Sequence, residues 1–165
     1  MLALQRQDQT SRAEANVSTN EVLISVVDDD PSVVEGVVSL MESVGHAAVG
    51  FRSAEDFLSS SQLGRTACLI LDVCMPGMGG LELQRRMTAA ADRTPIIFIT
   101  AHGEGNVSAE ALRRGAVAFL RKPFSQESLL EAVRSALAKS VGSRPAQPKL
   151  PSALQSASEK HNIER

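Results

Sequence analysis

The sequence has no tryptophan and no tyrosine, and it has only five phenylalanines and two cysteines. A core built from this chain must therefore be mostly aliphatic, and the hydrophobic fraction of 43% is sufficient for one. Neither Cys68 nor Cys74 has a cysteine or histidine partner at a metal-binding spacing. We therefore expect two buried free thiols in a reducing compartment, rather than a disulfide or a thiolate metal site.

Long apolar runs and surplus positive charge are also missing. No stretch approaches the roughly 20 apolar residues that span a bilayer, and the polar opening segment, with Asp8 and Glu14, lacks the apolar centre of a signal peptide. The formal net charge is −2, whereas a face that binds nucleic acid usually carries excess positive charge. These absences predict a cytoplasmic protein without membrane or nucleic-acid contacts.

The two ends of the chain lack hydrophobic periodicity. Residues 1–20 are rich in Gln, Ser, Thr, Asn and Ala, which predicts a disordered N-terminal extension. Residues 142–165 begin with a linker containing Gly and Pro and are too short and polar to form a second domain. We expect a flexible C-terminal tail there and one folded domain over residues 21–141.

Strand and helix patterns alternate through residues 21–141. Apolar, partly β-branched runs predict strands, and apolar residues at spacings of three and four predict helices. Asp30, followed by Pro31, is placed to cap the first helix, and Gly45 to end it; Ser53 is placed to cap the second. Such alternation predicts an α/β fold, a parallel sheet with helices on both faces. The predicted strands are residues 22–27, 46–51, 67–71, 95–99 and 117–120.

Polar side chains suited to phosphate chemistry stand at four of the strand ends. Asp28 and Asp29 follow the first strand, Asp72 the third, Thr100 the fourth and Lys122 the fifth. In an open parallel sheet these ends meet at one edge. Crowded carboxylates repel one another unless a cation neutralises them, and oxygen ligands suit Mg²⁺. A carboxylate beside Mg²⁺ can form an aspartyl phosphate, with the hydroxyl and the ammonium group sharing the product's charge.

Four segments in a specific order carry a resemblance to a known family. They are residues 26–30 (VVDDD), 71–78 (LDVCMPGM), 98–103 (FITAHG) and 119–124 (FLRKPF). With them, residues 21–141 resemble a receiver domain of two-component response regulators, most like the receivers of nitrogen-fixation-type regulators with a LuxR-type DNA-binding output. The resemblance implies a flavodoxin-like (βα)5 doubly wound parallel sheet with strand order 2-1-3-4-5. It also implies no enzyme activity beyond self-phosphorylation from a phosphodonor and autodephosphorylation.

The resemblance implies a metal and phosphate site. Asp72 would be the phosphoacceptor. Asp28 and Asp29 would form the acidic Mg²⁺ pocket with it, and the backbone carbonyl of Cys74 would be a further metal ligand.

The resemblance also implies a switch. Thr100 would move its hydroxyl onto the phosphoryl group, and Lys122 would pair with that group. The bond from Lys122 to Pro123 is commonly cis in the family. Phe119 would be the aromatic switch that turns inward when Thr100 moves.

Partners follow from the same resemblance. A sensor histidine kinase would supply the phosphoryl group. Downstream, we expect a protein target or a homodimer formed through the face of the fourth helix and fifth strand. No helix-turn-helix pattern follows residue 141, so we expect either a single-domain regulator or one separated from its output domain.

Two other functions stay open from the residues alone. Residues 28–33 (DDDPSV) fit the signature of haloacid-dehalogenase phosphatases, in which Asp28 would be the nucleophile and Asp72 would have no role. A receiver fold could also serve as a phosphorylation-independent interaction module. Three crowded carboxylates argue against that second alternative, because a scaffold does not need them.

Overall fold

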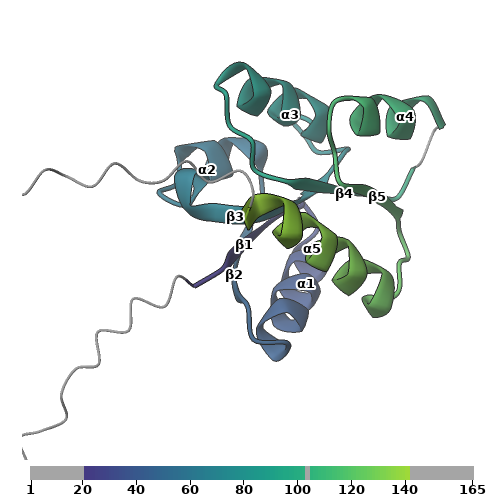
Figure 1. Ribbon diagram of the computed structural model, residues 1–165. Helices are drawn as coiled ribbons and strands as arrows, with labels where there is room; N and C mark the ends of the chain where they lie inside the picture. Colours follow the sequence, from purple (N-terminus) through teal and green to yellow (C-terminus); the bar gives the residue numbers. More distant parts are fainter. Residues whose placement is uncertain (1–20, 103–104, 142–165) are drawn as a thin grey trace, which may run out of the picture.

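The computed structural model describes residues 21–102 and 105–141, which form a parallel sheet between two layers of helices (Figure 1). The sheet order is β2-β1-β3-β4-β5, and every neighbouring pair is parallel. The predicted order 2-1-3-4-5 is therefore confirmed. The predictions for residues 1–20 and 142–165 lie outside the described residues. The strands are β1 (Leu23–Val27), β2 (Ala47–Phe51), β3 (Thr66–Asp72), β4 (Ile96–Thr100) and β5 (Ala118–Arg121).

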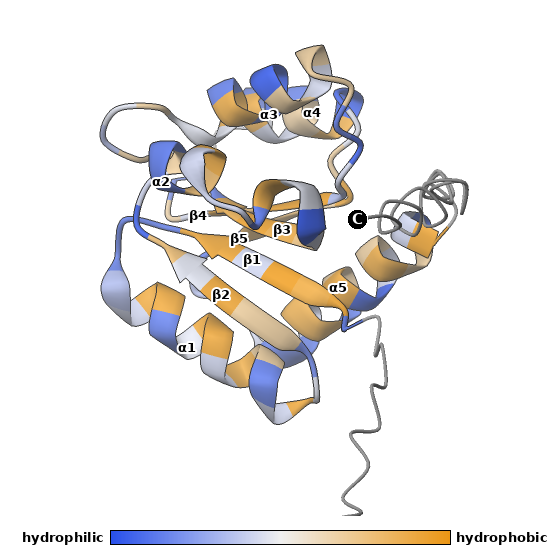
Figure 2. Ribbon diagram, turned by 90° about the vertical axis from the view of Figure 1, so that its left-hand side faces the viewer, coloured by the Kyte–Doolittle hydropathy of each residue, from blue (hydrophilic) through white to orange (hydrophobic). Residues whose placement is uncertain are grey.

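Helices α1 and α5 cover one face of the sheet, and α2, α3 and α4 cover the other (Figure 2). Among the described helices, none is long and apolar enough to cross a membrane. The helices are α1 (Pro31–Ser43), α2 (Ala54–Ser59), α3 (Gly80–Ala89), α4 (Gly105–Arg113) and α5 (Gln126–Val141), with a short 3-10 turn η1 (Leu63–Arg65).

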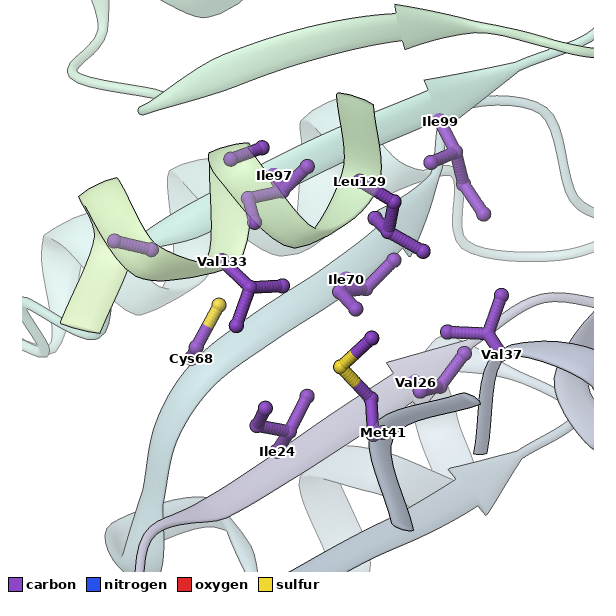
Figure 3. Packing of buried hydrophobic residues seen from close by; sticks show 12 residues of the cluster. Ile24, Val26, Val37, Met41, Cys68, Ile70, Ile97, Ile99, Leu129 and Val133 are labelled. Atoms are coloured by element: carbon purple, nitrogen blue, oxygen red, sulfur yellow. The ribbon is translucent and has the colours of Figure 1, made fainter. Parts of the chain in front are cut away.

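The core beneath α1 and α5 is aliphatic, as the scarcity of aromatic residues predicts (Figure 3). Alternate strand residues point to this face because successive side chains of a strand lie on opposite sides. The residues between them, such as Leu69 and Phe98, pack on the other face with Phe57 of α2 and Leu83 of α3. Burial on both faces explains the continuous apolar runs. The α1–α5 side includes Ile24, Val26, Val37, Met41, Cys68, Ile70, Ile97, Ile99, Leu129 and Val133.

The predicted helix caps are confirmed. The Asp30 carboxylate accepts a hydrogen bond from the Ser32 N–H at 2.9 Å, with Pro31 as the first helical residue. The Ser53 hydroxyl accepts from the Asp56 N–H at 3.1 Å. Gly45 follows α1 with φ at +91°, the left-handed conformation that glycine adopts without a steric penalty.

The two cysteines differ in exposure. Cys68 is buried in the core, as expected, but Cys74 is exposed. The prediction of two buried thiols is therefore wrong for Cys74. The reason is that β3 ends at Asp72, so Cys74 lies in the loop that follows the strand and not within the sheet. Both thiols are free.

Candidate functional site

All five polar residues predicted at the strand ends lie at the carboxyl edge of the sheet. Asp28 and Asp29 follow β1, and Asp72 ends β3; the register pairs Val27 with Leu71, so the two loops leave the sheet side by side. Thr100 ends β4 opposite Arg121 of β5. Lys122 comes next in the chain, and its N–H donates to the Thr100 carbonyl at 2.7 Å.

Three carboxylates form one cluster at this edge. Asp28, Asp29 and Asp72 each offer an oxygen, and these oxygens lie within 4.8 Å of one another. Asp28 is fully buried and Asp72 is 5% exposed, whereas Asp29 is exposed. The Lys122 ammonium group lies 2.6 Å from Asp28 Oδ2 and 3.8 Å from Asp72 Oδ2. One ammonium group cannot balance three carboxylates, so the cluster has surplus negative charge.

The crowding affects the ionisation of Asp72. Burial raises the pKa of Asp72 to about 6, and the neighbouring Asp28 carboxylate also raises it. Lys122 and the backbone N–H of Cys74 act in the opposite direction and lower this pKa. A cation among the three carboxylates would stabilise the ionised form. Hard oxygen donors and surplus negative charge are what a Mg²⁺ ion requires, so these residues fit that ion.

The hydroxyl of Thr100 is held by its own loop. Thr100 is fully buried, and its Oγ1 donates to the His102 carbonyl at 3.0 Å and accepts from the His102 N–H at 3.2 Å. Phe119, the register partner of Phe98, is half-buried with its ring centroid 6.2 Å from that of Phe98. The bond between Lys122 and Pro123 is cis, as the resemblance implied.

Sequence reasoning missed two charged residues that contact this site. The Arg52 guanidinium donates to the carbonyl of Asp29, from Nε at 3.2 Å and from Nη2 at 3.0 Å. The Glu55 carboxylate accepts from the Met78 N–H at 2.9 Å. Both residues follow β2, the one strand whose end carries none of the predicted site residues. Their position at that end was the available signal.

Glycine brings α3 close to the end of β3. A Cβ atom at Gly80 would overlap the backbone carbonyl oxygen of Asp72. The Gly80 N–H donates to the Val73 carbonyl at 2.9 Å. Any larger residue at this position would push the helix away from the loop that carries the site.

Residues 24–134 match the family described as response regulator receiver domain. The chain belongs to this family. It is 42% identical over 122 residues to response regulator protein TodT of Pseudomonas putida, covering 74% of this chain and 54% of TodT. It is 38% identical over 118 residues to transcriptional regulatory protein FixJ of Azorhizobium caulinodans, covering 72% of this chain and 56% of FixJ.

A solved structure of a response regulator is also similar to this chain. The structure of response regulator StyR matches with a TM-score of 0.70 and 42% identity, covering 74% of this chain and 62% of that one. The chain spans about half the length of the curated relatives it matches. The receiver is therefore the shared part.

Proposed function

We propose that Asp72 accepts a phosphoryl group from a phosphohistidine of a sensor kinase and that the chain works as a phosphorylation switch. The observation that carries this proposal is the placement of Asp72. Its carboxylate is almost buried, shares one oxygen cluster with Asp28 and Asp29, and lies 3.8 Å from the Lys122 ammonium group. Phosphoryl transfer depends mainly on such positioning and charge neutralisation.

Asp28, Asp29 and Asp72 would hold Mg²⁺ with their carboxylates, together with the backbone carbonyl of Cys74. When bound, the ion supplies positive charge that offsets the repulsion within the cluster and neutralises phosphoryl oxygens. The residues themselves provide the oxygen donors. Asp28 is further held by the Asp30 N–H, which donates to its Oδ1 at 2.9 Å.

In the transfer step, an Asp72 carboxylate oxygen attacks the phosphorus. The new P–O bond forms as the P–N bond to the donor histidine breaks, and the imidazole keeps the electron pair and takes a proton from solvent. The Lys122 ammonium group and the Thr100 hydroxyl pair with the phosphoryl oxygens. In autodephosphorylation, a water molecule attacks the phosphorus of the acyl phosphate and the bond between phosphorus and the Asp72 oxygen breaks. The Asp72 carboxylate and inorganic phosphate are released, and the protons of the water pass to phosphate and solvent.

The switch follows from the present partners of Thr100. Its hydroxyl would have to leave the backbone of His102 to reach a phosphoryl oxygen. We propose that this movement vacates space beside β5, which pairs with β4. Phe119, half-buried on β5, would turn into that space. The surface of α4 and β5 would change as a result, and we propose it as the face for a protein target or a homodimer.

Intact-protein mass spectrometry with acetyl phosphate tests the proposal. With Mg²⁺ we expect a gain of one phosphate, lost in excess EDTA and in Asp72→Ala. A gain that survives Asp72→Ala would overturn it. Hydrolysis of a generic phosphomonoester that needs Asp28 but not Asp72 would instead favour the phosphatase alternative. Partner binding that is equal for wild type and Asp72→Asn, with or without phosphodonor, would favour the interaction module.

Two further expectations stay predictions. We expect this chain not to shift duplex DNA in a salt-dependent manner, because its net charge is negative. We also propose a cytoplasmic location, which fits a kinase-dependent switch. Fractionation of the source cells followed by immunoblotting checks the second point.

A further inference from the structure

The chain segment after β2 reaches both loops of the proposed metal site. We call residues 51–55 the β2–α2 junction. Its first residue, Phe51, accepts from the Asp28 N–H at 3.1 Å through its carbonyl. Arg52 donates two N–H groups to the Asp29 carbonyl, and Glu55 accepts from the Met78 N–H. These three attachments join the junction to the β1–α1 and β3–α3 loops.

Glu55 is fitted closely to the β3–α3 loop, residues 73–79. Gly77 has φ at +76°, and a Cβ atom there would lie 2.8 Å from Glu55 Oε1. The Met78 N–H lowers the pKa of Glu55, so this bond has a charged acceptor at neutral pH. Within the described part of the chain, Glu55 is the one side chain from outside β3 that hydrogen-bonds to this loop.

The ends of the β3–α3 loop are fixed by backbone–backbone hydrogen bonds, whereas among the described residues no such bond reaches residues 74–78. At the start, the Val73 N–H donates to the Ile99 carbonyl at 3.1 Å. At the end, the Gly80 N–H donates to the Val73 carbonyl. Cys74, whose carbonyl is a proposed metal ligand, lies between the anchor at Val73 and the Glu55 contact at Met78. The path of the backbone at Cys74 therefore depends on how the loop is held at Met78.

We propose that Arg52 and Glu55 are positioning residues for the Mg²⁺ site. Arg52 holds the main chain at Asp29, and Glu55 holds the loop that carries Cys74. Neither side chain is a ligand itself. The inference rests on the proposed function, because it assumes that Asp29 and Cys74 contribute to metal binding.

Calorimetric titration of the metal-free 165-residue chain with Mg²⁺ tests the role of Glu55. We expect Glu55→Ala to weaken Mg²⁺ binding about three- to ten-fold, because the lost hydrogen bond is exposed and acts on the metal only through the loop. Glu55→Gln should recover most of the affinity, because the amide oxygen can accept the same N–H. Asp56→Ala is the matched control, since Asp56 is equally exposed in the first turn of α2 without a side-chain contact to the loop. It should bind Mg²⁺ as wild type does.

Arg52→Ala gives a second and independent variant, with exposed Arg65→Ala as its control. We expect a similar loss of Mg²⁺ affinity for Arg52→Ala and none for Arg65→Ala. Lower unfolding stability of both junction variants in EDTA with unchanged Mg²⁺ affinity would overturn the proposal, because the bonds would then be only structural.

Amide hydrogen exchange in EDTA separates this inference from the proposed function. Faster exchange at Met78 in Glu55→Ala, but not in Asp56→Ala, is the expected result and needs no metal. Unchanged exchange at Met78 would overturn the role of Glu55. Failure of the proposed function would appear elsewhere, as a wild-type chain that takes no phosphate on Asp72.

Discussion

Aspartate side chains occur at both edges of the sheet, but their hydrogen-bonding and ionic partners differ between the two edges. At the amino edge, the turn before β4 is closed locally: Asp92 Oδ1 accepts from the Thr94 N–H at 2.9 Å and from its hydroxyl at 2.6 Å. At the carboxyl edge, Asp28 and Asp72 are buried beside each other and beside Asp29, with one ammonium group between them. The first arrangement is complete within its own loop, whereas the second has surplus negative charge. Polar groups left incompletely compensated are therefore the better guide to function in this fold.

Lys122→Met should give the largest change at the carboxyl edge. Removing the ammonium group leaves the fully buried Asp28 carboxylate without its ionic partner, and breaking a buried pair in this way costs about 3–5 kcal/mol. Urea unfolding followed by circular dichroism in EDTA checks this. The double variant Asp28→Asn with Lys122→Met should regain much of the lost stability. A single variant as stable as wild type would contradict the importance of the pair.

Asp72→Asn should act in the opposite direction and stabilise the metal-free protein. The folded-state pKa of Asp72 is raised to about 6, so the native state retains a proton that the unfolded state has lost. The free energy of unfolding of wild type should thus fall as pH rises from about 4 through about 6, by up to about 3 kcal/mol from this group.

The same urea unfolding experiment, performed in EDTA at several pH values, measures this difference. Asp72→Asn should lack this pH-dependent loss. Its free energy of unfolding should therefore exceed that of wild type by the full amount at about pH 8, and the difference should vanish below about pH 4. A stability difference that grows as the pH falls would contradict the predicted direction. Asp92→Asn at the amino edge should show no such gain.

Ala91→Gly should give the smallest effect and only at the amino edge. Ala91 lies just after the C-terminal end of α3 with φ at +58°. This left-handed conformation is unfavourable for alanine, because its Cβ atom crowds the backbone. Glycine there should raise the free energy of unfolding by about 0.5–1 kcal/mol. Mg²⁺ affinity should not change. A change in Mg²⁺ affinity would show that the two edges are coupled.

The sequence alone predicts most of this fold because its signals are local. Helix periodicity, the caps at Asp30 and Ser53 and the polar residues at four strand ends depend on neighbours in the chain. The exposure of Cys74 and the contacts of Arg52 and Glu55 depend instead on how loops from different strands meet. Such contacts follow from register and loop path, which no local pattern specifies.

Borohydride trapping tests the central claim most directly. The chain is phosphorylated with acetyl phosphate and Mg²⁺, reduced with sodium borohydride, which converts an aspartyl phosphate to homoserine, and analysed by peptide mass spectrometry. The account predicts homoserine at position 72 alone, with none in a sample kept in EDTA. Homoserine at the position of Asp28, Asp29 or Asp30, with Asp72 unmodified, would contradict it.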